Sequence, residues 1–367
     1  MSVGRTAVSR GEVTRAVRAQ LGADAEVGEW TAVPLGRGRG DATTSLGVVR
    51  VSGTAQVGGK PAAWSQIRKV FVPAPDVAGL DMGRSVGHWN YWRREPELMA
   101  SGYLTRLPPG VAAPIAYVVD AGTAAVTVWM EDLGDLTAPE WTPQELDRVA
   151  HGLGRLGGWF AGRPPAEAWL STDLLGQWVR DLPGMTVPLL GPGARGWGHP
   201  VARSVFANGP AGPVARLIEQ APSQLAAVAA PPRTFCHRDP GLDNLLLRSH
   251  PEEIVLFDWA LAGTGPVGED LGVLFASVAR HTAGEPMAVC RRLFDHYLVG
   301  IGSAGATAID GTAVWRAAVA TAALRECIFA AFHIARGIEE PGAGAQTLAA
   351  LARDAAAIEA LAAAALI

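Results

Sequence analysis

The sequence predicts an α+β protein with two lobes, the first rich in β-sheet and the second mainly helical. The chain has 367 residues, which is long for a single hydrophobic core. Short strand-like runs, punctuated by glycine and proline, extend to about residue 130. Helical periodicity dominates from Trp141 onward. We therefore place the first lobe at residues 1–132 and the second at residues 133–367.

The first lobe is predicted to begin with a short amphipathic helix within residues 1–22 and to continue as a sheet. Four runs have the composition of strands, namely "SLGVVRVSG" (45–53), "AWSQIRKVFV" (63–72), "APIAYVV" (113–119) and "AAVTVWM" (124–130).

The second lobe is predicted to open with a helix, because Thr142 and Glu145 have the spacing of a capping box. Two strand-like runs, "NLLLR" (244–248) and "EIVLFDW" (253–259), interrupt the helical pattern and should pair as a β-hairpin. The residues expected to anchor this hairpin against the helices are Leu245, Leu247, Val255 and Phe257. The alanine-rich tail at 348–367 carries three charged residues and should form a packed terminal helix, not a membrane span.

Composition excludes several classes of function. The net charge is −4, the pI is about 6.1 and mean hydropathy is +0.17, with no basic run that would bind nucleic acid or an anionic membrane. Three scattered cysteines suit a reducing compartment, and the N-terminus lacks the apolar region of a signal peptide. We therefore expect a cytoplasmic protein without nucleic-acid or membrane partners; the sequence leaves its oligomeric state open.

The hairpin segment "TFCHRDPGLDNLLLRSHPEEIVLFDW" (234–259) is dense in polar residues. Asp239 and Asn244 precede the first strand and Asp258 ends the second, so pairing of the strands should bring the three together. Carboxylate and amide oxygens suit a hard cation such as Mg²⁺. One carboxylate, that of Asp239, would remain to orient a hydroxyl and accept its proton, a division of roles that fits phosphoryl transfer from a metal-bound nucleotide.

Several motifs make the chain resemble the aminoglycoside phosphotransferase and choline kinase-like family of the protein kinase-like superfamily. They are "HRDPGLDN", "LFDW" followed by "GTGPVGEDLG", and "YWRREPELMASGYL". The resemblance implies a bilobal kinase-like fold, ATP as co-substrate, Mg²⁺ held by Asn244 and Asp258, and Asp239 as the catalytic residue. It also implies a hydroxylated small-molecule acceptor, and structural bracing of the catalytic loop by His237 and Asp270.

The same resemblance requires a lysine on the third strand to hold the nucleotide phosphates, and Lys69 fits this position. Its neighbour Arg68 must point to the opposite face of the strand. The carboxylate partner of Lys69 is expected to be Glu95 at the start of the next helix. Because Pro96 follows Glu95 directly, Glu97 stays open as the alternative.

A glycine-rich stretch and the link between the lobes complete the expected nucleotide site. In "PLGRGRGDATTSLGVVRV", Gly40, Thr44 and Ser45 are predicted to cover the phosphates. In "AVTVWMEDLGD", the resemblance places Met130 at the back of the adenine pocket, with the backbone of Glu131 and Leu133 facing adenine.

Two other functions compete with the kinase hypothesis. "GRSVG" (83–87) matches the nucleophile motif of α/β-hydrolases, with Ser85 as nucleophile, but that motif requires a preceding strand and a following helix. A non-catalytic nucleotide-binding relative is expected to lack at least one of four residues that are all present, namely Lys69, Asp239, Asn244 and Asp258.

The charge of the expected acceptor wall is nearly balanced. Residues 133–230 contain eight acidic residues and seven arginines. A polycationic aminoglycoside would favour a strongly acidic surface, so this balance favours a neutral or singly charged acceptor. The sequence does not identify the acceptor, the hydroxyl that is phosphorylated, or the choice between ATP and GTP.

Overall fold

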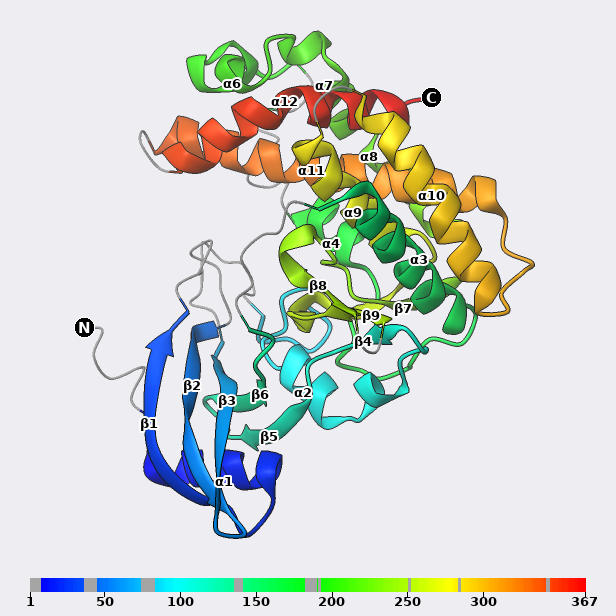
Figure 1. The fold of residues 1–367 in the computed structure, drawn as a ribbon. Helices are drawn as coiled ribbons and strands as arrows, with labels where there is room; N and C mark the ends of the chain where they lie inside the picture. Colours follow the sequence, from blue (N-terminus) through cyan, green and yellow to red (C-terminus); the bar gives the residue numbers. More distant parts are fainter. Residues whose placement is uncertain are drawn as a thin grey trace.

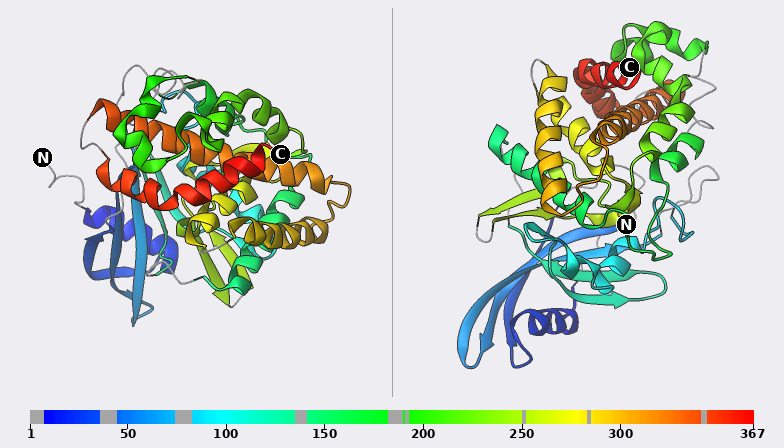
Figure 2. Two further views of the ribbon diagram at one scale, coloured as in Figure 1. Left: turned by 90° about the horizontal axis from the view of Figure 1, so that it is seen from above. Right: turned by 90° about the vertical axis from the view of Figure 1, so that its right-hand side faces the viewer.

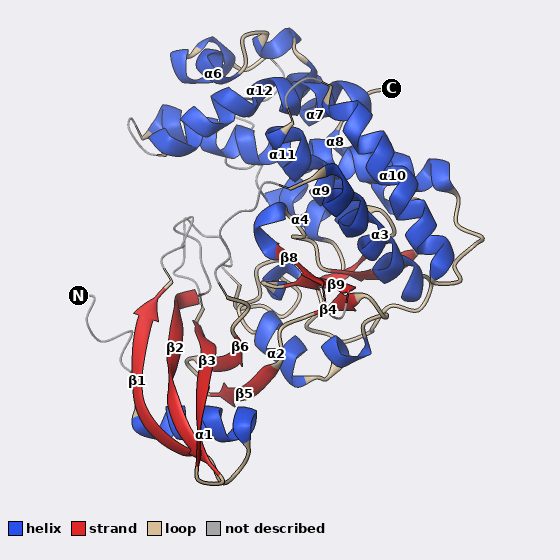
Figure 3. Cartoon of the chain, viewed as in Figure 1, coloured by secondary structure: helices blue, strands red, loops and turns tan. Residues whose placement is uncertain are grey.

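The structure, a computed structural model, describes residues 8–35, 45–73, 83–134, 141–181, 190, 193–249, 252–282, 285–340 and 344–367. A sheet-rich first lobe joins a mainly helical second lobe, as predicted (Figure 1; Figure 3). The strand β6 ends at Glu131 and the helix α3 begins at Pro143, so the predicted boundary at 132/133 falls between these two elements.

The first lobe is built on one five-stranded antiparallel sheet in the order β1-β2-β3-β6-β5. Its strands are β1 (Glu26–Pro34), β2 (Ser45–Val57), β3 (Lys60–Phe71), β5 (Ala116–Ala121) and β6 (Val126–Glu131). The four predicted strands are present, but β1 was not predicted. Its residues are mostly exposed because it lies at the sheet edge, so it lacks the alternation of buried and exposed residues that marks a half-buried strand.

The predicted N-terminal helix, α1 (Arg10–Leu21), packs against one face of this sheet (Figure 1). Ser9 and Glu12 form a capping box that fixes its start. The Gln66 side chain donates a hydrogen bond to the Ala16 carbonyl, and Arg68 pairs with Glu12 at 3.0 Å. Arg68 therefore points to the α1 side of β3, and Lys69 points to the other side, as the strand alternation predicts.

Two helical elements and one short strand lie between β3 and β5 along the chain. They are α2 (Arg94–Ala100), the 3₁₀ turn η1 (Tyr103–Arg106) and β4 (Val111–Ala112). β4 pairs in parallel with a strand of the second lobe, so the hairpin of that lobe extends into a three-stranded sheet, β4-β9-β8.

The second lobe is mainly helical and holds the predicted hairpin. β8 (Leu245–Ser249) pairs antiparallel with β9 (Glu252–Leu256). Its helices are α3 (Pro143–Trp159), α4 (Leu174–Asp181), α6 (Pro200–Val205), α7 (Pro213–Glu219), α8 (Ala221–Ala229), α9 (Glu269–His281), α10 (Pro286–Ser303), α11 (Gly311–Glu339) and α12 (Ala345–Ala365). Thr142 caps α3 with the predicted capping box, and the tail forms the predicted packed helix α12.

Smaller elements connect these helices. They are the 3₁₀ turns η2 (Arg195–Gly198), η3 (Gly209–Ala211), η4 (Leu242–Asn244) and η5 (Trp259–Leu261), and the strands β7 (Arg233–Cys236) and β10 (Gly263–Pro266). β7 and β10 pair antiparallel as a second, unpredicted ribbon directly beside the polar segment.

Two of the four residues predicted to anchor the hairpin face the helical lobe, and the other two do not. Leu245 lies opposite Leu256, and Leu247 lies opposite Ile254, and these four residues face the core of the helical lobe. Val255 lies opposite Leu246, so it and Phe257 point to the other face. The prediction treated the odd-numbered positions of both strands as one face. Which positions of two paired strands share a face depends on the register of the pairing.

α11 crosses the core of the second lobe, between α9 and α12 (Figure 2). Within the described residues it is the one helix long and apolar enough to cross a membrane, and 78% of its apolar window is buried inside the protein. Its buried face packs into the main hydrophobic core, as the central helix of a globular lobe does.

Candidate active site

The residues predicted for metal binding meet at the open end of the β8–β9 hairpin. The Phe257 amide donates to the Asn244 carbonyl at 3.2 Å, which places Asn244 beside the end of β9. Asp258 follows at once with left-handed backbone angles (φ 62°), one of two described non-glycine residues with positive φ. Such a conformation turns the chain sharply and aims the Asp258 side chain away from the ladder.

Lys69 connects the two lobes through two carboxylates. Its Nζ lies 2.7 Å from Glu95 Oε2 and 2.8 Å from Asp258 Oδ1. Burial alone would lower the pKa of Lys69, but the charges of Asp258 and Glu95 outweigh it and raise this pKa above its usual value. The lysine therefore stays charged, as a phosphate-binding group must.

Glu95, and not Glu97, is the partner of Lys69. Glu95 is buried as the second residue of α2, with Pro96 in the first turn where its missing N–H costs no helical hydrogen bond. Glu97 instead accepts a hydrogen bond from the Tyr91 hydroxyl at 3.0 Å. Burial raises the pKa of Glu95 to about 7, against the opposing charge of Lys69.

Asp239 is held by two side chains. Asn244 Nδ2 donates to its Oδ2 at 3.0 Å, and Arg325 Nη2 lies 2.5 Å from its Oδ1. Burial raises the pKa of Asp239, and the positive charge of Arg325 opposes that shift. A third of the Asp239 side chain remains exposed, so another molecule can still reach it.

His237 braces the loop that carries Asp239. Its Nε2 lies 3.0 Å from the Phe257 carbonyl, and its Nδ1 accepts the Asp239 amide at 3.1 Å. Burial lowers the pKa of His237 to about 4, so the ring is neutral at pH 7 with Nε2 as the donor. Both ring nitrogens are occupied by backbone groups, which leaves none to act as a base.

Asp270 braces the same loop from the start of α9. Its two carboxylate oxygens accept the amides of His237 at 3.0 Å and Arg238 at 2.7 Å. These bonds support Arg238, whose φ of 69° is the second left-handed value among the described non-glycine residues. Its buried guanidinium also pairs with Glu269 at 3.1 Å. Burial raises the pKa of Asp270 to about 7.

The residues predicted to bind the nucleotide base and cover its phosphates are only partly placed. Gly40 and Thr44 lie outside the described residues. Ser45 begins β2, and its hydroxyl accepts the Gly47 amide at 3.3 Å. Met130 is buried in a small core with Phe71 and other residues of the first lobe.

The two remaining predicted nucleotide contacts lie at the link between the lobes. Glu131 forms an ion pair with Arg248 of β8, and its amide donates to the Ile115 carbonyl at 2.8 Å. Leu133 is half-buried. The contacts of Met130, Glu131 and Leu133 with adenine therefore stay predictions.

The oxygens near Asp258 fit a hard divalent cation. Asn244 directs its amide nitrogen to Asp239, so its amide oxygen is left for a metal ion. The Asp258 side chain is 46% exposed and uses Oδ1 for Lys69. Among the described residues no group of three or more His, Cys, Asp or Glu could hold a metal. One carboxylate and one amide suit Mg²⁺, which retains waters and takes phosphate oxygens as further ligands.

Arg325 was not predicted from the sequence. Arg325 also donates to the Arg238 carbonyl at 3.0 Å, and its guanidinium carbon lies 5.3 Å from the centroid of Trp178 on α4. One signal was available: Arg325 and Glu326 interrupt an otherwise apolar stretch of a long helix. Charged residues within an apolar helix usually have a specific partner.

The surroundings of Ser85 do not match a hydrolase nucleophile. Bends and turns follow it up to Trp92, and the next helix, α2, begins only at Arg94. The motif requires a helix to start directly after the serine, because the helix N-terminus helps to form the oxyanion hole.

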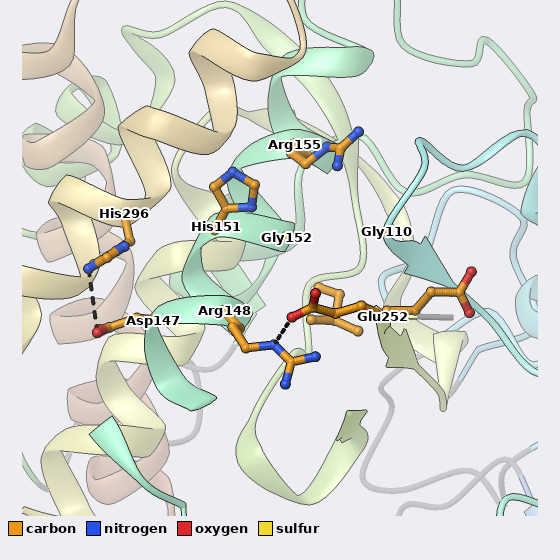
Figure 4. Close-up of a pocket in the computed structure, with 10 residues that line it drawn as sticks. Gly110, Asp147, Arg148, His151, Gly152, Arg155, Glu252 and His296 are labelled. Carbon is orange, nitrogen blue, oxygen red and sulfur yellow. Dashed lines mark ion pairs between the residues drawn. The ribbon is translucent and has the colours of Figure 1, made fainter. Parts of the chain in front are cut away.

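A pocket of about 370 Å³ lies away from these residues, at the turn end of the hairpin (Figure 4). It is lined by α3, α10 and the start of β9. Two contacts join its polar side chains: Arg148 forms an ion pair with Glu252 at 3.0 Å, and His296 Nε2 lies 3.4 Å from Asp147. The catalytic candidates are at the opposite end of β9, so this pocket is not part of their site.

Comparison with known proteins finds a family model that matches part of the second lobe. Residues 180–333, less than half of the chain, match the model of the phosphotransferase enzyme family. A comparison with curated proteins finds no match.

Solved structures resemble nearly the whole chain. Amicoumacin kinase hAmiN, solved with AMP-PNP and Ca²⁺, has 13% identity and a TM-score of 0.56 over 89% of this chain and 87% of its own. Spectinomycin phosphotransferase APH(9)-Ia has 11% identity and a TM-score of 0.54 over 90% and 93%. An ethanolamine kinase from Plasmodium vivax has 12% identity and a TM-score of 0.52 over 89% and 82%.

At these identities the solved structures establish the fold alone. The family model matches the segment that contains Asp239, Asn244, Asp258 and Arg325. The chain has the protein kinase-like fold, and its resemblance to the aminoglycoside phosphotransferase and choline kinase-like family is confirmed over residues 180–333.

Proposed function

We propose that this protein is an ATP- and Mg²⁺-dependent phosphotransferase that moves the γ-phosphoryl group to a hydroxyl of a small molecule, such as an antibiotic, a sugar or another metabolite. One observation carries the proposal: Lys69 is held between Glu95 and Asp258, beside the Asp239–Asn244 pair. Phosphoryl transfer requires a phosphate-binding cation, metal-binding oxygens and a hydroxyl-orienting carboxylate around one point, and these residues would supply them.

The reaction assigns a separate task to each residue. Lys69 would bind the phosphates, and Asn244 and Asp258 would hold Mg²⁺, which when bound would neutralise part of the phosphate charge. Asp239 orients the acceptor hydroxyl. The bond between the acceptor oxygen and the γ-phosphorus forms, and the bond from that phosphorus to the β-phosphate oxygen breaks. Asp239 takes the hydroxyl proton, and ADP leaves.

Positioning and charge should supply most of the rate, because the transferred group passes through a loose transition state. The strained backbone at Arg238 and Asp258, held by His237 and Asp270, supports this role, since a preformed loop does not have to reorganise during the reaction.

The similar structures support a small-molecule acceptor, because their names refer to amicoumacin, spectinomycin and ethanolamine. The AMP-PNP and Ca²⁺ in the amicoumacin kinase structure support use of a nucleotide and a divalent cation. The cytoplasmic location expected from the sequence stays a prediction, as do the adenine contacts and the phosphate-covering loop.

The test is ADP release from Mg·ATP in a panel of hydroxylated metabolites and antibiotics, with wild type and Asp239→Asn. We expect at least one acceptor to stimulate the wild type, and the variant to lose about 10²-fold or more of that stimulation while binding Mg·ATP normally. Asp295→Asn, on the exposed side of α10, is the matched control and should keep full activity.

The main alternative is a non-catalytic nucleotide-binding relative. It predicts calorimetric binding of Mg·ATP with no acceptor-dependent ADP release in either protein. Equal turnover of the wild type and Asp239→Asn would show that Asp239 does not serve the acceptor, and the proposal would fail.

A further inference from the structure

Arg325 joins α11 to the catalytic loop through two hydrogen bonds. One guanidinium nitrogen lies 2.5 Å from Asp239 Oδ1, and the other donates to the Arg238 carbonyl at 3.0 Å. The Arg325 side chain is 17% exposed, so little water competes for these bonds. A charge-assisted bond in such a place is stronger than one between exposed groups.

These contacts fix the orientation of the Asp239 carboxylate. Arg325 holds Oδ1 and Asn244 holds Oδ2, so rotation of the side chain would break both contacts. Each carboxylate oxygen has two lone pairs and one of these contacts, so either oxygen can still accept a hydrogen bond from an acceptor hydroxyl. That hydroxyl then lies against a carboxylate that Arg325 already contacts.

The Arg325 guanidinium also covers one face of an aromatic ring. It lies over the ring of Trp178, and Trp89 packs edge-on against Trp178 with centroids 5.5 Å apart. An exposed tryptophan face beside a catalytic carboxylate would attract a positively charged acceptor. Here the protein's own cation takes that position, and it repels a second cation brought near Asp239.

We propose that Arg325 is a positioning residue for Asp239 and that it makes the preferred acceptor a neutral or anionic alcohol, not an amino alcohol. This inference rests on the proposed phosphotransferase function. Phosphoryl transfer proceeds as described above, with the acceptor proton passing to Asp239; Arg325 remains protonated and exchanges no proton.

The positioning role is tested with Arg325→Met, which keeps an unbranched side chain of similar reach to the arginine stem and removes the charged guanidinium. We expect acceptor-dependent kcat to fall by about tenfold or more, because a poorly held base loses part of its catalytic effect. The Kd of Mg·ATP by calorimetry and the melting temperature should stay near wild type. Arg325→Lys should recover most of kcat, since its ammonium keeps the charge.

Two controls separate positioning from a general structural effect. Arg316→Met makes the same change on an exposed part of the same helix and should leave kcat unchanged. In an Asp239→Asn background, Arg325→Met should lower kcat further by less than about twofold. The reason is that substitutions at residues that act through one another do not have additive effects. Equal losses in both backgrounds, or equal effects of Arg325→Met and Arg316→Met, would overturn the positioning role.

Acceptor charge is tested with three probes that share a three-carbon skeleton: glycerate (anionic), glycerol (neutral) and 2-amino-1,3-propanediol (cationic). Each is measured for stimulation of ADP release and for inhibition of the best acceptor from the panel. We expect the cationic probe to be the weakest on wild type, by about tenfold, and the gap to close in Arg325→Met. A preference for the cation, or an equal response to all three, would overturn the charge selection.

Failure of the proposed function and failure of the role of Arg325 alone would give different results. If the proposed function is wrong, Asp239→Asn leaves ADP release unchanged. If only the role of Arg325 is wrong, Asp239→Asn is inactive while Arg325→Met behaves like Arg316→Met.

Discussion

Lys69 shows how a single residue can depend on both lobes. It is one of two lysines in the chain, and its ammonium pairs with Glu95 of the first lobe and Asp258 of the second. Its burial would be unfavourable without these partners, so the two carboxylates keep it charged and in place. Bound phosphates would share this cation with the carboxylates.

We predict that Lys69→Ala lowers kcat/KM for ATP by about tenfold or more, because one contact to the developing phosphate charge is lost. Lys60→Ala is the matched control, since Lys60 is exposed at the first residue of β3, and it should stay within about twofold of wild type. Initial rates of ADP formation against ATP concentration give the comparison. Swapped effects of the two variants would refute the assignment of Lys69.

Among the secondary-structure elements, the β8–β9 hairpin positions the two residues proposed to bind the metal ion. Its register fixes Asn244 beside Phe257, and its buried face of Leu245, Ile254 and Leu256 holds it on the helical lobe. Asp258 extends beyond this packed part and is nearly half exposed. Removing its side chain should therefore affect the ligand more than the fold.

We predict that Asp258→Ala abolishes the Mg²⁺-dependent part of ATP binding, measured by calorimetry with and without Mg²⁺, because a carboxylate ligand is lost. The melting temperature should change little. Ser85→Ala should bind Mg·ATP and transfer phosphate normally. Retained Mg²⁺-dependent binding in Asp258→Ala, together with lost activity in Ser85→Ala, would favour the hydrolase alternative.

The contact between α3 and α10 relies on glycine at the crossing. A Cβ on Gly300 of α10 would overlap the His151 carbonyl oxygen of α3, and one on Gly154 of α3 would overlap the Tyr297 carbonyl oxygen of α10. These glycines allow the two helix backbones to approach closely. Gly302, two residues along α10, has no atom within 4 Å of the corresponding position.

We predict that Gly300→Ala destabilises the protein by about 2 kcal/mol or more, because a methyl group cannot fit without moving one helix. Gly302→Ala should be neutral or stabilising by up to about 1 kcal/mol, since alanine is the better helix former. Urea unfolding of both variants measures the difference. Similar stabilities would mean that the two helices can separate without cost.

On the scale of the whole molecule, ion pairs span the lobes on both sides of the expected nucleotide site. Lys69 reaches Asp258, and Arg248 of β8 reaches Glu131 at the end of β6. The loop that carries Asp239 is held to Phe257, at the end of β9, by the neutral ring of His237. Protonation of His237 in acid should therefore disturb the candidate site and also lower the stability of the fold.

We predict a loss of stability below pH 6.5 that is specific to His237. Its pKa is about 4 in the folded protein, against 6.5 for a solvent-exposed histidine, so the unfolded chain binds a proton that the folded protein excludes. Stability is then complete above pH 6.5 and is lost as the pH falls toward 4, by up to about 3 kcal/mol. His237→Gln should lack this part of the acid dependence.

The measurement is urea unfolding of the wild type and His237→Gln at several pH values between 4 and 8, without nucleotide or metal. The difference in unfolding free energy should be largest at neutral pH and shrink as the pH falls. A difference that is constant across the range would mean that the His237 ring titrates equally in both states.

The sequence by itself determined the features that depend on neighbours along the chain. Strand alternation separated Lys69 from Arg68, the capping box placed the start of α3, and the spacing of Asn244 and Asp258 predicted a hairpin that brings them together. These follow from the periods of helices and strands and from short turns, which local patterns encode. The motifs around Asp239 indicated the resemblance to a phosphotransferase family and, from it, the expected kinase chemistry.

Only the tertiary structure decided the contacts between distant elements. Arg325 lies 86 residues beyond Asp239, and its approach depends on how α11 crosses the second lobe. The choice of Glu95 over Glu97, the buried face of the hairpin and the glycine contact of α3 with α10 likewise depend on packing angles and register. A local sequence pattern does not specify these, because each is set by the simultaneous fit of several elements around a shared core.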